Sequence, residues 1–412
     1  MHSLASTEPA ARHASGPDRE LTPTDAGIAR STRRLRVTFL VRSLEYGGAE
    51  RQLVVLARAL SERGHLVSVV TFYSGGPLEA ELRRAGTRVR SLEKRGRWDL
   101  TSFAVRLRRV IREERPDVLH GYLGTPNIAA TMISPFFPGM RIVWGERASN
   151  MDLSHYDWLS RLSSVTCCAL SRFPDLLIVN SRAGREHAIR RGYPAQKMVV
   201  VPNGIDTQRF RPDPIARRRL RHEWNVSEAE LLVGLVSRLD PVKDHRTFLL
   251  AASAVAKMRE DVRFVCVGDG DPEYRRAMQE LVEALGLAGR VSWVAAQSDV
   301  TAVYNALDIS CSSSASEGFP NAVGEAMACG VPCVATDVGD CAWLVGQPRL
   351  IVPPGEPRRL AQVIEWVLSL DASERGRLHT ELRGRVVTHF SVANLTDATE
   401  RELLALFPGD GQ

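Results

Sequence analysis

Two patterns of apolar positions alternate along the chain from residue 35 onward. Short apolar runs at residues 36–41 and 66–72 are typical of buried strands, and residues 51–62 between them repeat apolar positions at helical spacing. Further strands are expected in this half at residues 118–120, 142–144, 176–179 and 198–200. Because strands that alternate with helices form parallel sheets covered by helices, the pattern predicts an α/β fold.

The pattern changes near Pro202, and Pro212 and Pro214 then interrupt any helix or central strand. Strands resume at residues 231–236, 263–267, 291–294, 309–311 and 333–335, and helices at about 371–389 and 392–406 close the chain. The predicted organisation is a disordered leader (1–34), an N-terminal Rossmann-like domain (35–205), a connection (206–228), a C-terminal Rossmann-like domain (229–388) and a final helix and tail (389–412). We expect this last helix to pack back on the N-terminal domain, and the two domains to face a cleft.

Composition argues against a membrane-spanning chain and a secreted one. Apolar residues make up 44% of the sequence, but the longest apolar runs fall short of the roughly 18 residues that a spanning helix needs. The N-terminal residues contain no apolar segment of the kind found in secretory signals, so a cytoplasmic protein is expected. The 7 cysteines have no metal-like spacing, which predicts reduced thiols and no metal site.

Positive charge is concentrated in the first half of the chain. Residues 1–200 contain 31 Lys and Arg against 19 Asp and Glu, a balance of +12, whereas the remainder contains 23 against 29, a balance of −6. Within residues 103–112 basic and apolar positions alternate at helical spacing, which predicts a helix with one basic face. Anionic lipid is one partner that fits this face, and a solvated helix face is the alternative. Nucleic acid is not expected, because no aromatic residues interleave with these charges.

The segment 316–332, SEGFPNAVGEAMACGVP, carries the strongest chemical signal. Glu317 and Glu325 flank a sharp turn and a helix start, which Asn321 is expected to cap. A helix start presents free N–H groups that suit a phosphate, and carboxylates accept hydrogen bonds from hydroxyl groups. The segment therefore predicts a nucleotide-sugar pocket whose turn is formed by Gly318, Phe319, Pro320 and Asn321. The alternative is an ordinary strand-to-helix junction with two surface glutamates.

Two cations lie in the loop that follows the expected strand 231–236. Arg238 and Lys243 can both approach one diphosphate, where fixed positive charge stabilises the leaving group of a sugar transfer. Taken alone, they are better explained as exposed cations near a helix start. No metal-binding Asp-x-Asp motif is expected, and these two residues are expected to replace a divalent metal ion.

Candidate residues of the N-terminal half carry weaker signals. Gly47 and Gly48 open a helix, where they can let the backbone approach a ligand and tolerate positive φ, although a Gly-Gly turn on its own is more often structural. His120 is expected to end a strand and to project into the cleft, although a lone histidine is usually a structural residue.

Together these segments resemble the retaining GT-B glycosyltransferases, in particular family 4 (glycosyl transferases group 1). The resemblance runs from about residue 35 to the last helix and includes EYGGAERQL, VNSRAG, VPNGID and VGDGDPEYR. It implies two Rossmann-like domains facing a cleft, a nucleotide-diphosphate sugar as donor and no cofactor or metal. It also implies acceptor contacts at Gly47 and Gly48, a cleft contact at His120, and acceptor contacts at Arg147 and Asn150 of WGERASN.

The same resemblance implies sugar transfer to a hydroxyl acceptor with retention of configuration. Arg238 and Lys243 would hold the diphosphate, Glu325 the ribose hydroxyls and Glu317 the transferred sugar. Polysaccharide, lipopolysaccharide or glycolipid synthesis, with the protein peripheral at the inner membrane face, fits the basic N-terminal half. The loop 295–299, which would face the nucleobase, lacks the glycine that relatives often have there. The sequence therefore does not decide whether the donor nucleotide is UDP or GDP. The alternatives are a nucleotide-sugar 2-epimerase and a non-catalytic subunit that binds nucleotide sugars.

Overall fold

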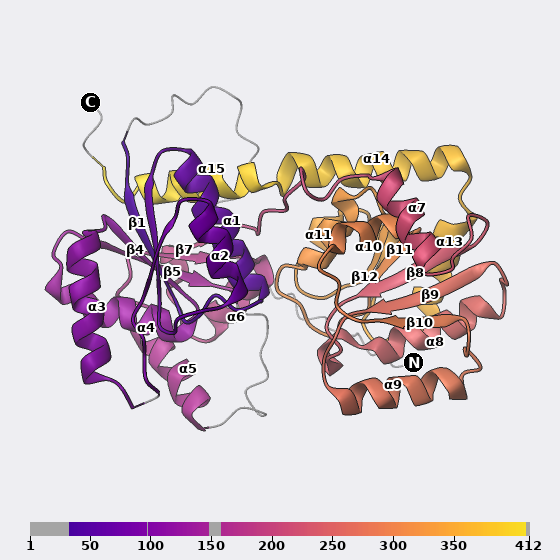
Figure 1. Ribbon diagram of the computed structural model, residues 1–412, viewed down its shortest axis with the longest axis horizontal. Coiled ribbons are helices and arrows are strands. Elements are labelled where there is room, and N and C mark those ends of the chain that lie inside the picture. The colour runs from indigo at the N-terminus through magenta and orange to yellow at the C-terminus, as the bar shows by residue number, and fades with distance from the viewer. Residues whose placement is uncertain (1–32, 97, 148–157, 409–412) are drawn as a thin grey trace, which may run out of the picture. The chain divides into compact units, whose positions relative to one another are not determined.

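The computed structural model describes residues 33–96, 98–147 and 158–408, with the backbone alone for residues 158–161. The expected leader, residues 1–34, therefore lies almost entirely outside the described residues. Two parallel β-sheets, each covered by helices, organise the described chain (Figure 1). Each sheet forms a body with the helices that cover it, the N-terminal body and the C-terminal body.

The N-terminal body contains a seven-stranded sheet with the strand order β3-β2-β1-β4-β5-β6-β7. All of its strand pairs are parallel. The strands are β1 (Arg36–Val41), β2 (Leu66–Thr71), β3 (Arg88–Ser91), β4 (Val118–Tyr122), β5 (Arg141–Glu146), β6 (Leu176–Val179) and β7 (Met198–Val200). The apolar runs predicted six of these strands. The edge strand β3 was missed, because its sequence RVRS alternates charged and apolar residues and only Val89 is buried.

Helices cover both faces of this sheet. They are α1 (Gly48–Glu62), α2 (Pro77–Arg84), α3 (Thr101–Glu114), α4 (Gly124–Ile133), α5 (Trp158–Leu170) and α6 (Arg182–Arg190), together with the last helix of the chain, α15 (Val392–Leu404). On one face Leu53 of α1 and Leu395 of α15 share a core with Phe39. On the other face Phe103 of α3 and Ala130 of α4 share a core with Leu40. The alternation of β1 side chains between the two cores explains its continuous apolar sequence.

Polar contacts join α15 to the N-terminal body as well as apolar ones. Glu400 accepts a hydrogen bond from Arg63 at 2.6 Å and lies 2.8 Å from Nε2 of His65. Asp397 pairs with the same arginine at 2.6 Å. The last helix thus packs against α1 and the residues that follow it, although it is more than 300 residues away in the sequence.

The C-terminal body contains a six-stranded parallel sheet with the order β10-β9-β8-β11-β12-β13. Its strands are β8 (Leu231–Val236), β9 (Val262–Val267), β10 (Val291–Val294), β11 (Ile309–Ser312), β12 (Cys333–Thr336) and β13 (Ile351–Val352). Its helices are α7 (Pro214–Glu223), α8 (His245–Ala256), α9 (Pro272–Ala284), α10 (Val300–Ala306), α11 (Asn321–Ala328), α12 (Cys341–Val345), α13 (Pro357–Ser369) and α14 (Ala372–His389). Strand β13 was not predicted, since two residues are too few to form a recognisable pattern.

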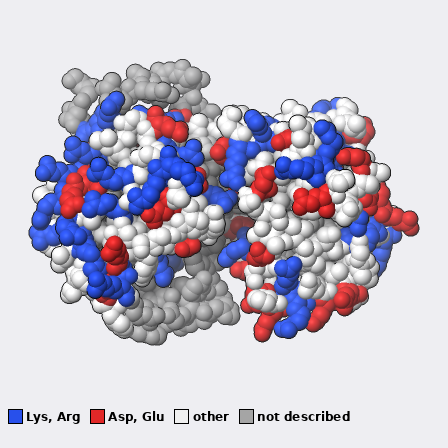
Figure 2. Space-filling model, viewed as in Figure 1, with Lys and Arg blue, Asp and Glu red and all other residues white. Residues whose placement is uncertain are grey.

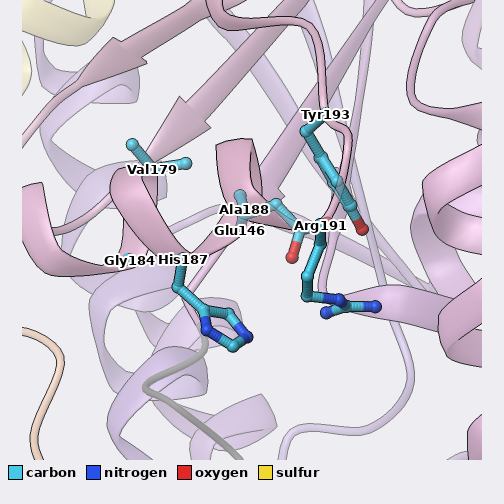
Figure 3. Close-up of a pocket in the computed structure, with 7 residues that line it drawn as sticks. All are labelled: Glu146, Val179, Gly184, His187, Ala188, Arg191 and Tyr193. Atoms are coloured by element: carbon cyan, nitrogen blue, oxygen red, sulfur yellow. The ribbon is translucent and has the colours of Figure 1, made fainter. Parts of the chain in front are cut away.

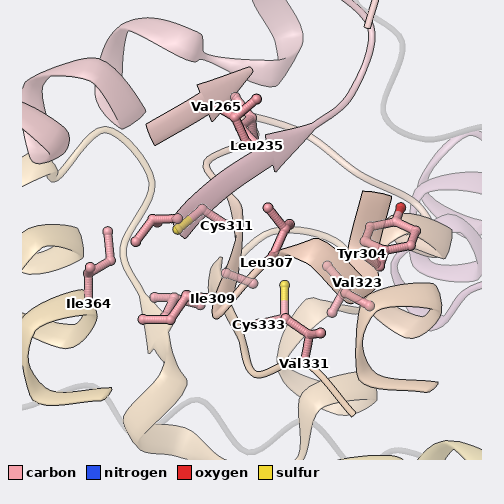
Figure 4. Close-up of a cluster of buried hydrophobic side chains, with 14 of the residues drawn as sticks. Leu235, Val265, Tyr304, Leu307, Ile309, Cys311, Val323, Val331, Cys333 and Ile364 are labelled. Carbon is pink, nitrogen blue, oxygen red and sulfur yellow. The ribbon is translucent and has the colours of Figure 1, made fainter. Parts of the chain in front are cut away.

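One apolar core fills the C-terminal body. Leu235, Cys311 and Cys333 contribute to it from three neighbouring strands, and Val323 from α11 packs against them (Figure 4). All seven cysteines of the chain are free thiols, and among the described residues no group of three or more His, Cys, Asp and Glu could hold a metal ion.

The expected connection, residues 206–228, contains a helix that the sequence pattern did not predict. Asp213 caps α7 by accepting hydrogen bonds from the N–H groups of Ile215 and Ala216. Arg221 on this helix is almost fully buried, and it binds Asp308 at 3.1 Å and two carbonyl groups of residues 227 and 230. The segment is therefore a packed part of the C-terminal body.

Candidate functional site

Lys243 and Glu317 form the centre of the candidate site. Their side chains pair at 2.5 Å, and both are largely shielded, with 21% and 14% of the side-chain surface exposed. They are 74 residues apart, but the loops that carry them follow β8 and β11, which are neighbours in the sheet. Because the carboxyl ends of parallel strands meet at one edge, the topology places these two loops side by side.

Serine residues hold both members of this pair in place. Ser314 donates a hydrogen bond to the same oxygen of Glu317 at 2.7 Å. Ser313 donates to the backbone carbonyl of Lys243 at 3.0 Å. Neither serine was predicted from the sequence. For Ser314 a signal existed, because it precedes Glu317 by three residues on the same turn.

Arg238 is not part of this buried pair. Its side chain is 76% exposed, and its nearest acidic partner is Asp240 at 3.5 Å on the same loop. Asp240 also caps the short turn that ends at Lys243 by accepting from the N–H of Val242. The loop after β8 thus presents one shielded cation and one exposed cation at the same edge of the sheet.

The turn before α11 depends on a close approach of two backbone segments. Gly339 has φ +57, and a Cβ atom there would lie 2.4 Å from the carbonyl oxygen of Glu317. The next residue, Asp340, donates its N–H to the carbonyl of Gly318 at 3.0 Å. Phe319 is buried against Phe390, with the ring centroids 5.8 Å apart. The loop that follows β12 therefore packs against the turn before α11 and holds its backbone in place.

Asn321 does not cap α11 as the sequence had predicted. Pro320 occupies the N-cap position, and Asn321 is the first residue of the helix. The Asn321 side-chain oxygen instead accepts a hydrogen bond from Asn203 at 2.9 Å. No side chain caps the helix. Asn321 and Val323 donate their N–H groups to the carbonyls of Phe319 and Pro320, whereas the N–H of Ala322 has no acceptor among the described residues and can bind an anion.

Glu325 lies one turn into α11 beside a buried tyrosine. Tyr304 of α10 donates a hydrogen bond to its Oε2 at 3.1 Å. Burial raises the pKa of the Glu325 carboxyl, and the Tyr304 hydrogen bond acts in the opposite direction. Tyr304 was missed because the contact joins two helices through the fold, and nothing in the local sequence indicates it.

Gly47 and Gly48 do open a helix, but neither requires a left-handed backbone. Gly47 is the N-cap of α1 with φ −154, an extended value open to any residue, and Gly48 has no positive φ. A Cβ atom on Gly47 would meet only the movable end of Glu50, at 2.1 Å. Neither glycine therefore uses its tolerance of positive φ. The start of α1 resembles that of α11 in having no side-chain cap.

His120 lies inside β4, which continues to Tyr122, so it does not end a strand as expected. Its ring is fully buried between Phe39 and Tyr122, at centroid distances of 5.2 and 5.1 Å. Neither ring nitrogen has a hydrogen-bond partner among the described residues. Burial, with a smaller effect of Arg147, lowers the pKa of His120 to about 3. The imidazole is therefore neutral near pH 7.

Arg147 completes the N-terminal group of predicted residues. It donates hydrogen bonds to the hydroxyl of Tyr122, at 2.5 Å, and to the side chain of Asn203. Its guanidinium also lies 4.6 Å from the Tyr122 ring centroid. Asn150 lies outside the described residues. The structure thus gathers His120 and Arg147 around Tyr122 in the N-terminal body, and Lys243, Glu317 and the start of α11 in the C-terminal body.

Comparison with known proteins gives matches in both bodies. Residues 230–369 match the family described as "Glycosyl transferases group 1", and residues 46–209 match "Glycosyltransferase Family 4". D-inositol 3-phosphate glycosyltransferase of Mycobacterium tuberculosis is 33% identical over 232 residues, which cover 54% of this chain and 47% of that protein. The chain thus spans about half the length of the curated relatives that it matches.

Solved structures resemble most of the chain. The Anabaena protein HepE in complex with UDP has a TM-score of 0.79 and 23% sequence identity, covering 90% of this chain and 99% of that one. A glycosyltransferase from Rickettsia africae has a TM-score of 0.77 and 19% identity, covering 91% and 99%. Among the described residues, no helix is long and apolar enough to cross a membrane.

The two parallel sheets with their covering helices define a GT-B fold. The two family matches lie in the N-terminal and the C-terminal body respectively. Residues 230–369 therefore belong to the group 1 glycosyltransferases, and residues 46–209 belong to glycosyltransferase family 4.

Proposed function

We propose that this protein transfers a sugar from a nucleoside diphosphate sugar to a hydroxyl group of an acceptor, with retention of configuration. The observation that carries the proposal is the shielded Lys243–Glu317 pair beside the uncapped start of α11. A cation and the N–H group of Ala322 at the helix start suit a diphosphate, and the neighbouring carboxylates suit hydroxyl groups. UDP and UDP-glucose, which are bound in the HepE structures, are the first donors to test.

Lys243 and Arg238 have complementary roles in this mechanism. In the structure Lys243 is held by Glu317, whereas Arg238 extends into solvent. A diphosphate at the start of α11 would draw both cations, because breaking the sugar–phosphate bond develops negative charge on the leaving group. Glu325, which already accepts from Tyr304, would bind the ribose hydroxyls, and Glu317 would bind hydroxyls of the transferred sugar.

We infer a same-face reaction for the chemical step. The acceptor oxygen forms a bond to the anomeric carbon while the bond from that carbon to the diphosphate oxygen breaks. The acceptor proton passes to the departing phosphate, so the products are a glycoside and a nucleoside diphosphate. Glu317 already carries hydrogen bonds from Lys243 and Ser314, which favours a binding role for it over that of a covalent nucleophile.

Substitution of Lys243 tests the phosphate assignment. Lys243→Ala should lower turnover by roughly 10²-fold, the scale found when one charge-stabilising group is removed. It should also reduce the rise in melting temperature that UDP causes in the wild type. Lys257→Ala removes an exposed lysine at the end of α8 and serves as the matched control. Wild-type turnover in Lys243→Ala would disprove the assignment.

Product analysis separates the alternative functions. Incubation of the protein with UDP-glucose and candidate acceptors should release UDP together with a glycoside of retained configuration. A 2-epimer formed without free UDP would instead identify an epimerase. Tight UDP-glucose binding with neither transfer nor hydrolysis would identify a binding subunit.

We further infer that the protein acts at an anionic membrane surface on a lipid-linked acceptor in polysaccharide, lipopolysaccharide or glycolipid synthesis. Helix α3 separates its arginines into two sets. Arg106, which faces the body, pairs with Asp99 at 2.5 Å, and Glu113 pairs with Arg90 of β3 at 2.8 Å. The exposed set, Arg108, Arg109 and Arg112, has no acidic partner within the described residues and shares one helix face with Val105.

Exposed apolar side chains accompany this basic face. Trp98 and Leu100, just before α3, are 78% and 60% exposed, and Val105 is 69% exposed. The guanidinium carbon of Arg108 lies over the Phe136 ring, 4.7 Å from the ring centroid. Figure 2 shows basic side chains gathered over the part of the surface where α3 lies in Figure 1. Basic and apolar side chains on one surface suit a headgroup layer above hydrocarbon chains.

Vesicle binding tests the membrane proposal. Replacing Arg108, Arg109 and Arg112 by Gln should weaken binding to phosphatidylglycerol-containing vesicles about 100-fold, at about 1 kcal/mol for each arginine. Replacing the exposed Arg218, Arg358 and Arg359 of the C-terminal body by Gln makes the same change of charge and should have little effect. Equal binding by both triple variants would contradict the assignment, as would binding that does not depend on anionic lipid.

A further inference from the structure

A small cavity in the N-terminal body, with a few polar groups in its lining, has no role in the mechanism above. Its volume is about 20 Å³, which holds a single water-sized group. The lining residues come from the ends of β5 and β6, from α6 and from the segment after it (Figure 3). They are Glu146, Val179, Gly184, His187, Ala188, Arg191 and Tyr193.

The position of the cavity follows from the sheet topology. Glu146 is the last residue of β5, and it is paired in register with Val179, the last residue of β6. Both strands end at the carboxyl edge of the sheet, and α6 begins three residues after Val179. Open parallel sheets bind their ligands beyond this edge. The cavity is therefore placed where ligands enter folds of this kind.

The Glu146 carboxyl is shielded but only partly satisfied. Its Oε1 accepts one hydrogen bond, from the side-chain amide of Asn127 at 2.9 Å. No other described side chain donates to it, although a carboxylate can accept several hydrogen bonds. Burial raises the pKa of Glu146 to about 7, against the opposing effects of Asn127 and of the more distant Arg191.

The Arg191 guanidinium approaches the cavity without forming an ion pair with Glu146. It donates a hydrogen bond to the carbonyl of Ser164 at 3.2 Å and another to the hydroxyl of the same residue. Figure 3 shows the Glu146 carboxyl directed toward Arg191, with Tyr193 and His187 on either side. The cavity thus has a hydrogen-bond acceptor, Glu146, and a donor, Arg191, in a lining that also contains apolar side chains.

This distribution of donors and acceptors selects one kind of ligand group. A phosphate would meet the Glu146 carboxylate, and an amine would meet Arg191, so either charge would face repulsion. A hydroxyl group both donates and accepts a hydrogen bond, and it is the size of the water that the cavity can hold. A hydroxyl can therefore donate to Glu146 and accept from Arg191 at the same time.

We propose that this cavity binds one hydroxyl group of a sugar or another polyol, with Glu146 accepting its hydrogen bond and Arg191 donating to it. On the proposed function, on which this inference rests, the polyol is the acceptor substrate, and Glu146 and Arg191 select it. The two residues are then specificity-determining residues that bind the acceptor away from the reacting atoms.

Glu146→Gln is the variant that tests this role. Glutamine keeps the size of the side chain and an oxygen that accepts from Asn127, but it removes the negative charge. The matched control is Glu186→Gln on α6, because Glu186 is 68% exposed and makes only a 3.8 Å pair with Arg190. Melting temperatures of both variants establish that each is folded before binding is compared.

Saturation-transfer NMR on the full chain measures binding of two probe polyols, myo-inositol and methyl α-D-glucopyranoside. At least one probe should bind the wild type and Glu186→Gln with equal affinity, and Glu146→Gln should bind it roughly 10-fold more weakly, the scale of one hydrogen bond to a charged group. If the bound probe also accepts sugar, its KM should rise in Glu146→Gln while the KM for the donor stays unchanged.

Three results would overturn the proposal. These are failure of both probes to bind the wild type, unchanged binding in a folded Glu146→Gln variant, and an equal loss of donor affinity in that variant. Thermal shift with UDP separates this inference from the proposed function. A UDP-dependent rise in melting temperature without polyol binding refutes the cavity assignment alone, whereas absence of the UDP effect counts against the proposed function itself.

Discussion

Replacement of Glu146 by glutamine should make the stability of the protein less dependent on pH. In the folded protein burial raises the pKa of this carboxyl to about 7, from an ordinary value of 4.5. Between these two values the folded state retains a proton that the unfolded state releases. The stability linked to this proton is complete below pH 4.5 and is lost as the pH rises through 7.

The size of the effect follows from the difference between the two pKa values. The rise from 4.5 to about 7, at about 1.4 kcal/mol for each pH unit, corresponds to about 3 kcal/mol. Glutamine carries no charge at any pH. Glu146→Gln should therefore gain about 3 kcal/mol relative to the wild type between pH 4.5 and pH 8.

The titratable groups near Glu146 do not produce the same pH-dependent difference in stability between the wild type and the variant. Burial lowers the pKa of His187 on α6, and burial raises the pKa of Cys167 on α5 to about 12. Burial also raises the pKa of Tyr193. Asn127 of α4 does not titrate. Any contribution of His187 is present in both the wild type and the variant, so it cancels in their difference.

Urea unfolding of the wild type and Glu146→Gln at several pH values measures this difference. A ¹³C NMR titration of the carboxyl carbon, assigned by its absence in the variant, measures the pKa directly. Glu186→Gln serves as the control and should show no pH-dependent difference. A carboxyl that titrates near 4.5, or a wild-type-to-variant difference that is constant with pH, would refute the reasoning.

Two further predictions concern the C-terminal body. Gly339→Ala should destabilise the protein by more than about 1 kcal/mol and weaken UDP binding in a thermal-shift assay, because a Cβ atom would collide with the carbonyl of Glu317 where φ is +57. Gly376→Ala, where nothing lies within 4 Å of the new atom, is the control, and an equal effect of both changes would contradict this account. Arg221→Met should cost about 1–3 kcal/mol in urea unfolding, because it leaves the carbonyl groups of Ser227 and Glu230 without their donor, while Asp308 keeps Arg217 at 2.8 Å. A loss below about 1 kcal/mol would show that the buried arginine is dispensable.

Much of the fold could be predicted because each buried strand has a local apolar signature. Residues 36–41 and 231–236 were predicted with the bounds that β1 and β8 have in the structure. Strand β3 and helix α7 could not be predicted in the same way, because an edge strand buries few residues and α7 is predominantly basic. The stability of these elements comes from the sheet or the core against which they pack.

The candidate site was predictable in its chemistry and only partly in its geometry. The sequence predicted that Lys243 and Glu317 bind one ligand, and the structure shows their side chains paired at 2.5 Å. It placed His120 at a strand end, whereas the ring is buried inside β4. Glu146 was not predicted as a site residue, although its neighbour Arg147 was. Nothing in the local sequence distinguishes a carboxyl that faces a cavity from one that faces solvent.

By itself, the sequence determined the α/β alternation, the two bodies and the residue types available for binding a sugar diphosphate. These properties depend on short-range periodicity and on the chemistry of single side chains. Only the tertiary structure decided which of those side chains meet, which are buried and which lack partners. The pairing of Lys243 with Glu317 and the shielding of Glu146 both arise because parallel strands bring loops distant in sequence to the same edge of a sheet.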